Sequence, residues 1–240
     1  QVASVKGTKD DRYAVSWTDD SFGMAPWFFN FDTSWLKNDD TESNLDDPKA
    51  AEVLQFMVDL IHKHKVSPQP AGWDERGQFH SGHLAMRGCG RWCVGQAKND
   101  NFTDWNFQYF PHKAGPLRTV IGGGGWGIAT MSKNPQECWR VVNLLNCREI
   151  QLKFINTVGS ICSRRSVVDS PDFQAAPPGV DMGLFYRSLD YGRVVPAPPN
   201  FNIVDPLMRR WYGQLWNGDI TVKAMLEGAH KELQAEMAKL

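Results

Sequence analysis

The stretch from residue 79 to residue 92, FHSGHLAMRGCGRW, is the most informative part of the chain. Its first half extends a predicted helix over residues 74–86, because Phe79, His83 and Met86 recur on one helical face. Its second half places Trp92 after the run Gly-Cys-Gly-Arg. A large aromatic side chain beside glycines is poorly placed to pack against regular elements. We therefore expect Trp92 to present a flat face to a ligand.

The segments on either side alternate between helical and extended patterns. Asp47-Pro48 predicts a helix start, and the apolar spacing continues to about His64. Residues 119–121 read as a short strand, and Asn134-Pro135 starts a further helix. Two more helices are predicted at residues 203–216 and 221–240. Helices interleaved with short strands, with no internal repeat, predict an α/β fold.

Composition excludes several classes of protein. The 26 basic residues are balanced by 27 acidic residues, so no basic excess exists to neutralise phosphates and we expect no nucleic-acid partner. A hydrophobic content of 42% with 13 Phe excludes a disordered chain. The longest apolar stretches, such as residues 121–131, are much shorter than the ~20 residues needed to cross a bilayer.

A glycine-rich segment follows the strand at residues 119–121. Gly122, Gly124 and Gly127 have the spacing of a dinucleotide fingerprint, but that motif needs a helix to begin inside it. Residues 128–131 read as strand instead, so we interpret the segment as a bend that displays Trp126, with a plain buried turn as the alternative.

Two histidines and two cysteines lie close together in the sequence. His80, His83, Cys89 and Cys93 are donor types that zinc accepts, but no second cysteine pair follows at structural-zinc spacing. We therefore predict no metal and no cofactor. Cys89 and Cys93 are near enough for a local disulfide, and two buried thiols are the alternative.

The chain contains 10 Trp, more than a core of this size needs. Residues 13–35 show no clean period and are expected to form short strand and loop, so Trp17, Trp27 and Trp35 stand in irregular segments, as does Trp73. Flat aromatic faces suit the apolar side of a sugar ring. Trp139 and Trp211, which lie on predicted helix faces, are expected to be core residues.

The run Phe79-x-x-Gly82-x-x-Ala85-Met86 followed by Gly90-x-Trp92 resembles the signature of extracellular solute-binding proteins of ABC sugar importers, the group that includes maltose- and trehalose-binding proteins. Further stretches match that family in the right order over most of the chain from about Trp35: Asp47 to Glu52, Gly124 to Ile128 with Ser132 to Pro135, Arg193 to Pro196, and Asn217 to Leu240.

The resemblance implies a type II periplasmic-binding-protein fold, in which two α/β lobes close around a sugar that is then delivered to a membrane permease. It implies no catalytic residue. Trp92 and Trp126 would stack on sugar rings, the Gly125 amide would donate to a hydroxyl, and Arg193 would hydrogen-bond hydroxyls from the rim. Val194 departs from the pattern because a proline commonly follows this arginine.

Members of that family are much longer than 240 residues, so we expect a fragment that lacks the N-terminal part. The resemblance assigns residues 1–121 and 166–240 to the C-terminal lobe, and residues 122–165 to a segment that crosses into the N-terminal lobe. An exposed apolar patch on the helices at residues 135–155 is then predicted, with dimerisation or segment exchange as its consequence.

The same resemblance predicts a periplasmic or extracellular protein, with a lipoprotein anchor as one arrangement, and no signal peptide is present in this sequence. Two alternatives remain. A carbohydrate-active enzyme would need two carboxylates about 5 to 10 Å apart, and Asp74, Glu75 and Asp104 are the acids near Trp92. The other alternative is an interaction domain without a ligand.

Overall fold

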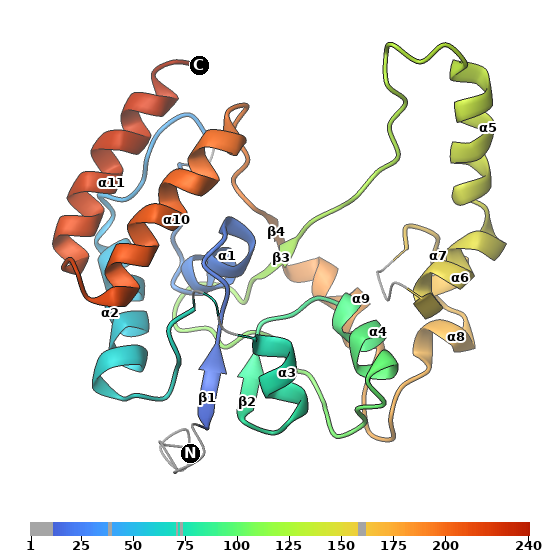
Figure 1. Cartoon of the computed structure of the whole chain (residues 1–240), viewed down its shortest axis with the longest axis horizontal. Helices are drawn as coiled ribbons and strands as arrows, with labels where there is room; N and C mark the ends of the chain where they lie inside the picture. The colour runs from blue at the N-terminus through green and yellow to red at the C-terminus, as the bar shows by residue number, and fades with distance from the viewer. Residues whose placement is uncertain (1–11, 38–39, 71, 73, 158–161) are drawn as a thin grey trace. The chain divides into compact units, whose positions relative to one another are not determined.

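The computed structural model describes residues 12–37, 40–70, 72, 74–157 and 162–240 (Figure 1). The chain forms two compact units. The first comprises residues 1–88, 110–121 and 191–240, and the second comprises residues 89–109 and 122–190. Among the described residues, no helix is both long enough and apolar enough to cross a membrane.

The described part of the first unit contains four strands in two parallel pairs. β1 (Tyr13–Ser16) pairs with β2 (Leu84–Arg87), and β3 (Thr119–Ile121) pairs with β4 (Gly192–Val194). The helices of this unit are α1 (Ser21–Asn30), α2 (Pro48–Val58), the π-helical turn η2 (Asp59–Lys63), α3 (Glu75–His80), α10 (Phe201–Asn217) and α11 (Val222–Met237).

Helix α1 is the centre of the first unit's core. Asp20 caps it by accepting from the Gly23 amide at 2.7 Å. A Cβ atom on residue 23 would overlap the backbone of Thr18, so only glycine allows the chain to turn this closely into the helix. Phe28 and Phe29 of α1 are at most 1% exposed.

Four tryptophans belong to this core. The Trp17 ring meets the Trp27 ring at 5.4 Å and the Trp216 ring at 5.8 Å, both edge to face. Trp35 is 1% exposed and packs beside Phe28 at 5.6 Å. The aromatic core therefore joins the end of β1, helix α1 and helix α10.

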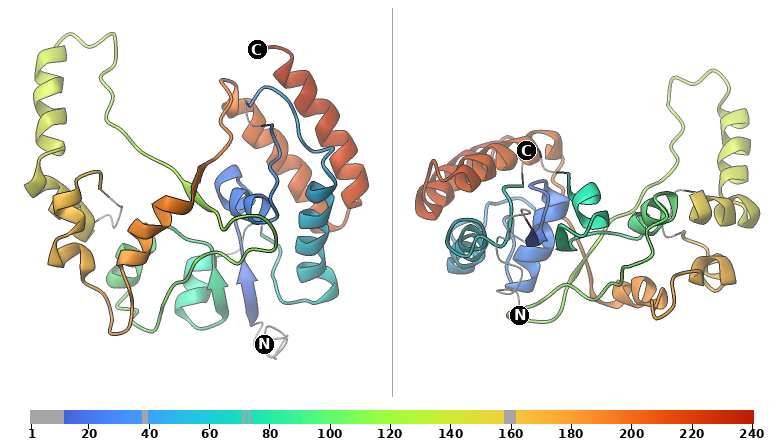
Figure 2. Two further views of the ribbon diagram at one scale, coloured as in Figure 1. Left: turned by 180° about the vertical axis from the view of Figure 1, so that it is seen from behind. Right: turned by 60° about the horizontal axis from the view of Figure 1, so that its bottom comes forward.

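Helices α10 and α11 run side by side, and α2 packs against α11; the orange and red pair stays together in every view (Figure 2). α11 is capped by Thr221, whose hydroxyl accepts from the Ala224 amide at 3.2 Å. Met225, Ala229 and Leu233 recur at four-residue spacing and are fully buried, which explains why this segment folds as an amphipathic helix.

The second unit is built from short helices and long irregular segments. Its small core consists of Ile155, Val167, Val168 and Phe173. The elements are α4 (Trp92–Asn99), α5 (Pro135–Leu145), α6 (Arg148–Thr157), α7 (Arg165–Val168), α8 (Pro171–Gln174) and α9 (Gly183–Arg187); the turn η3 (Ser188–Tyr191) leads back to the first unit.

Most predicted elements are confirmed: the helix after Asp47, the strand at residues 119–121, and the helices that start near residues 135, 203 and 221. The predicted helix at residues 74–86 is wrong in its second half, because Gly82 adopts a positive φ of 77° that ends α3 and β2 follows.

Two further expectations about backbone structure are wrong. Residues 13–35 contain the ten-residue helix α1, which Pro26 concealed, since proline inside a helix removes a backbone donor. Residues 128–131 form no strand. Both expectations rested on the local sequence pattern, whereas contacts with distant residues decide the structure of these two segments.

The compact units and the lobes expected from the resemblance share the boundary after Ile121. They differ elsewhere, since residues 89–109 and 166–190 group with residues 122–165 in the second unit. The assignment of residues 1–121, 122–165 and 166–240 to lobes stays a prediction.

Asp205 links α10 to α1, and its loss should weaken the first unit. One carboxylate oxygen accepts from the Ser21 amide at 2.8 Å and the other from Arg209 Nε at 2.8 Å. Burial alone would raise the pKa of Asp205, but the hydrogen bonds from Ser21 and the charge of Arg209 outweigh it and hold the pKa below its ordinary value. We expect Asp205→Asn to lower the free energy of unfolding at pH 7 by about 1 kcal/mol.

This stabilisation is present above the unfolded pKa of about 3.9 and is lost as the pH falls through the lowered folded pKa. Urea denaturation at pH 7 and pH 3 should therefore show that the difference in the free energy of unfolding between variant and wild type is smaller at pH 3. Asp219→Asn, at an exposed carboxylate, is the control and should behave as wild type. A gap of equal size at both pH values would contradict this account of Asp205.

Candidate functional site

Trp92 is the first residue of α4 and is 40% exposed. The ring lies against the backbone of Gly90: a Cβ atom there would overlap Cζ3 of the Trp92 indole. The Cys93 amide donates to the Gly90 carbonyl at 3.1 Å and closes the turn that enters the helix. The glycine before the tryptophan therefore supports its ring, and part of the indole remains open to solvent.

Cys89 and Cys93, left open by the sequence, form a disulfide with a Cα–Cα distance of 6.3 Å. Since both sulfurs are in this bond, neither cysteine supplies a thiolate to a metal. Among the described residues, no group of three or more His, Cys, Asp and Glu side chains could hold a metal ion.

Arg91, unlike Trp92, is buried and is 4% exposed. Its guanidinium lies 4.5 Å from the centre of the Phe173 ring and donates to the Phe173 carbonyl at 3.3 Å. Burial lowers the pKa of Arg91 to about 10, which still leaves the group charged at neutral pH. Arg91 thus ties the turn before α4 to the core of the second unit, a role that the sequence did not reveal.

Trp126 lies in the irregular segment after β3 and is 52% exposed. Its ring meets the Phe154 ring of α6 edge to face at 6.2 Å. Gly125, beside it, has open space around the position of a Cβ atom, so no contact requires glycine there. Trp92, Gly125 and Trp126 all belong to the second unit.

Arg193 lies in β4, opposite Val120 in the parallel ladder of the first unit. Its guanidinium stacks 4.4 Å from the centre of the Phe29 ring. Burial, together with the neighbouring charge of Arg118, lowers the pKa of Arg193, and Asp32 partly offsets this. The contact with Phe29 anchors the Arg193 side chain on the aromatic core of the first unit.

The other tryptophans separate into buried and exposed groups. Trp17, Trp27 and Trp35, expected in irregular segments with faces free for a ligand, are at most 8% exposed, so that interpretation is wrong for these three. Trp73 lies outside the described residues. Trp139, expected in the core, is 53% exposed, and that expectation is wrong too. Trp211 packs against the main core and agrees with the prediction.

The acids near Trp92 in sequence have other roles. Asp74 caps α3 by accepting from the Gly77 amide at 3.0 Å. Glu75 accepts from the Ser16 hydroxyl at 2.5 Å, at the carboxyl end of β1. Asp104 is exposed. The structure therefore gives two of the three acids structural partners.

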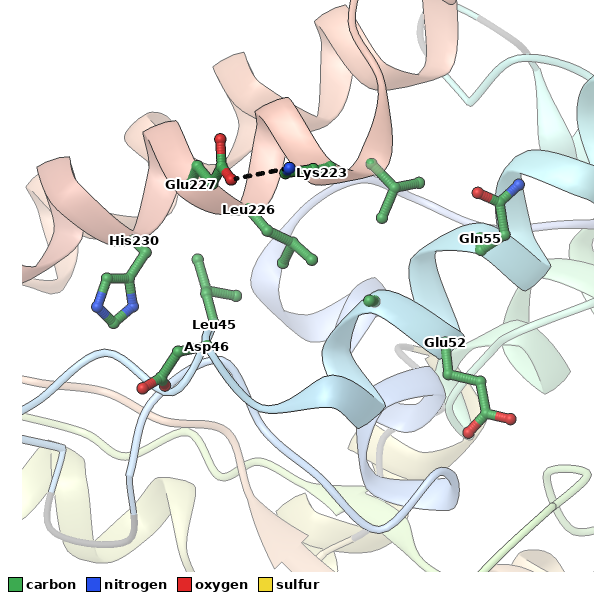
Figure 3. A pocket seen from close by; sticks show the side chains of 10 residues that line it. Leu45, Asp46, Glu52, Gln55, Lys223, Leu226, Glu227 and His230 are labelled. Atoms are coloured by element: carbon green, nitrogen blue, oxygen red, sulfur yellow. Dashed lines mark ion pairs between the residues drawn. The ribbon is translucent and has the colours of Figure 1, made fainter.

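The first unit also contains a cavity of about 660 Å³ between α2 and α11 (Figure 3). Leu45 and Leu226 contribute apolar surface, and Lys223 pairs with Glu227 at 3.8 Å on the rim. None of its ten lining residues is Trp, Tyr or Phe. The cavity lacks the flat rings that a sugar would stack on.

The sequence matches the family model of bacterial extracellular solute-binding proteins over residues 2–178. The chain belongs to this family of solute-binding proteins. The expected fold class is confirmed by solved structures that superpose on nearly the whole chain.

One such structure is the maltose/maltodextrin-binding domain MalE of Bdellovibrio bacteriovorus bound to maltotriose, with a TM-score of 0.84 and 18% identity over 98% of this chain. Another is an ABC substrate-binding protein of Listeria monocytogenes in complex with cycloalternan, with a TM-score of 0.83 and 18% identity over 99% of this chain. A third is maltose-bound MalE3 of T. maritima, with a TM-score of 0.79 and 21% identity over 94%. This chain spans 64%, 62% and 61% of their respective lengths.

Glu75 offers a test of the electrostatics at the end of β1. Burial raises the pKa of Glu75 above its ordinary value, and the Ser16 hydrogen bond offsets this only partly. A raised folded pKa means that stability falls as the pH rises above the unfolded value of about 4.3. We therefore expect Glu75→Gln, which can still accept from Ser16, to be more stable than wild type at pH 7 and equal to it at pH 4.

Thermal unfolding of both proteins at the two pH values measures this difference. Glu137→Gln, on the exposed face of α5, is the matched control and should change stability little at either pH. A Glu75→Gln variant that is less stable at pH 7 would show that the ionised carboxylate stabilises this site.

Proposed function

We propose that this chain is the carbohydrate-binding part of an ABC importer component. It binds a mono- or oligosaccharide in an interlobe cleft and delivers it to a membrane permease, without covalent chemistry. It works in the periplasm or outside the cell. The observation that carries the proposal is the pair of tryptophans, Trp92 and Trp126, which are 40% and 52% exposed in a chain of the solute-binding family.

Exposed indoles at these two positions suit a sugar for a physical reason. A pyranose ring has an apolar C–H face that packs on an aromatic ring, while its hydroxyls need hydrogen-bond donors and acceptors around the edge. Trp92 packs against Gly90, and Trp126 meets Phe154, so both rings contact the protein and also keep part of their surface in solvent. The Gly125 amide and the Arg193 guanidinium are the polar groups that we propose for the hydroxyls.

Related structures support the choice of ligand class. The Bdellovibrio and T. maritima proteins are bound to maltotriose and maltose, and the Listeria protein to cycloalternan. All three ligands are carbohydrates, which is why glucose oligosaccharides are the first to test. The sugar that this chain prefers depends on polar contacts around the rings.

The proposal predicts that removal of either ring weakens sugar binding. We expect Trp92→Ala and Trp126→Ala each to raise the Kd for maltotriose about tenfold, equivalent to ~1.4 kcal/mol. Isothermal titration calorimetry against maltose and maltotriose measures the effect. Trp139→Ala removes an equally exposed ring, 53%, from α5 and should bind as the wild type does.

Equal losses of affinity in all three variants would mean that binding depends on general stability and not on two stacking faces.

Chromatography of the sugars after the titration separates this proposal from the carbohydrate-active enzyme. Unchanged maltotriose agrees with a binding protein, whereas shorter products would favour the enzyme. Absence of binding to any sugar would favour the interaction domain.

Helix α5, within residues 135–155 where an exposed apolar patch is predicted, carries exposed apolar side chains. None of the eleven residues of α5, all of them described, is buried. Trp139, Val141 and Leu144 are 53%, 54% and 58% exposed. We propose that a second copy of this chain covers α5, as a dimer or by exchange of the segment.

Light scattering after size exclusion tests the association. We expect the wild type to have a mass of about twice 27.1 kDa at high concentration, and Leu144→Glu to have the monomer mass, because a charge in the contact is costly to bury. Ile203→Glu changes an exposed apolar residue on α10 and should leave the mass unchanged. A wild-type monomer at every concentration would contradict the dimer.

A further inference from the structure

The turn that carries Trp92 is held at three points, and each has a different physical basis. The first is Gly90. A side chain at this position would overlap the six-membered ring of the Trp92 indole, whereas at Gly88, two residues earlier, the Cβ position is open space. A side chain at residue 90 would therefore force the Trp92 ring to move, whereas a methyl group at residue 88 would meet nothing.

The second point is covalent. The Cys89–Cys93 disulfide encloses Gly90, Arg91 and Trp92 and ties the start of the turn to the first turn of α4. The Gly90 carbonyl accepts from the Cys93 amide at 3.1 Å inside the same ring of atoms. A disulfide across so short a segment removes most of the conformations that the backbone around Trp92 could otherwise adopt.

The third point fixes the turn to the small core of the second unit, to which the turn itself belongs. Arg91 is 4% exposed, and its guanidinium both stacks on the Phe173 ring and donates to the Phe173 carbonyl. Phe173 is fully buried in the small core with Val167 and Val168. Moving the turn would break the contacts of the charged Arg91 side chain with Phe173. These contacts therefore couple the turn to the small core.

We infer that Gly90, the Cys89–Cys93 disulfide and Arg91 form a mount that holds the Trp92 indole in a single orientation before ligand arrives. These four residues are positioning residues and need not touch the ligand. Their value for binding rests on the proposed function, in which Trp92 stacks on a sugar. A ring that is already immobile loses little further freedom on binding, which favours affinity.

The structure suggests a test with one matched pair of variants. Gly90→Ala adds a methyl group under the ring, and Gly88→Ala adds the same group to open space. The protein is labelled with 5-fluorotryptophan, so that its 10 Trp give separate fluorine resonances, and Trp92→Phe identifies the Trp92 signal. We expect Gly90→Ala to move or broaden that signal and to raise the Kd for maltotriose about 3- to 10-fold. Gly88→Ala should do neither.

The second arm removes the disulfide by Cys89→Ser/Cys93→Ser, with Cys138→Ser, at an unbridged thiol, as its control. We expect the double variant to broaden the Trp92 signal and Cys138→Ser to leave it sharp. This arm keeps the inference testable if the methyl group of Gly90→Ala prevents folding. Circular dichroism establishes that each variant is folded.

An unchanged Trp92 signal in both Gly90→Ala and the double serine variant overturns the mount, whether or not maltotriose binds. If the signal moves as expected but Trp92→Ala binds maltotriose as tightly as wild type, then the proposed function fails at this residue and the mount stands as a structural feature alone. The two failures are therefore distinguishable.

Discussion

The edge-to-face packing of Trp17 between Trp27 and Trp216 is the contact on which the first unit depends. It joins the end of β1 and the next helix along the chain, α1, to α10, which lies near the other end of the sequence. Aromatic rings bury a large apolar area and meet in preferred geometries, so such a cluster both drives folding and fixes the relative orientation of the elements. The two short parallel strand pairs could not do this alone.

The tryptophans of the chain divide into a buried group and an exposed group. A tryptophan in the core has its surface covered by protein, and its flat face is not available to a ligand. Trp92 and Trp126 lie outside the aromatic core, in a unit whose own core is small, and keep about half of their surface in solvent. The division into a well-packed first unit and a sparser second unit therefore leaves these rings open to a ligand.

The sequence predicted the fold class and most helices because the capping pairs Asp47-Pro48 and Asn134-Pro135 and the apolar stripe of α11 are local signals. It could not predict α1, where Pro26 argues against a helix and burial of Phe28 and Phe29 overrides it. The Cys89–Cys93 disulfide could be predicted only as one of two alternatives, and the burial of Arg91 could not be predicted because it depends on contacts made only in three dimensions.

The central claim, that Trp92 and Trp126 stack on a sugar, is tested most directly by saturation transfer from the protein's aromatic protons to maltotriose. The account predicts strong transfer to the sugar's ring C–H protons in the wild type and its loss in the Trp92→Ala/Trp126→Ala double variant. Equal transfer in wild type and double variant would contradict the account, because the sugar would then lie against other aromatic rings.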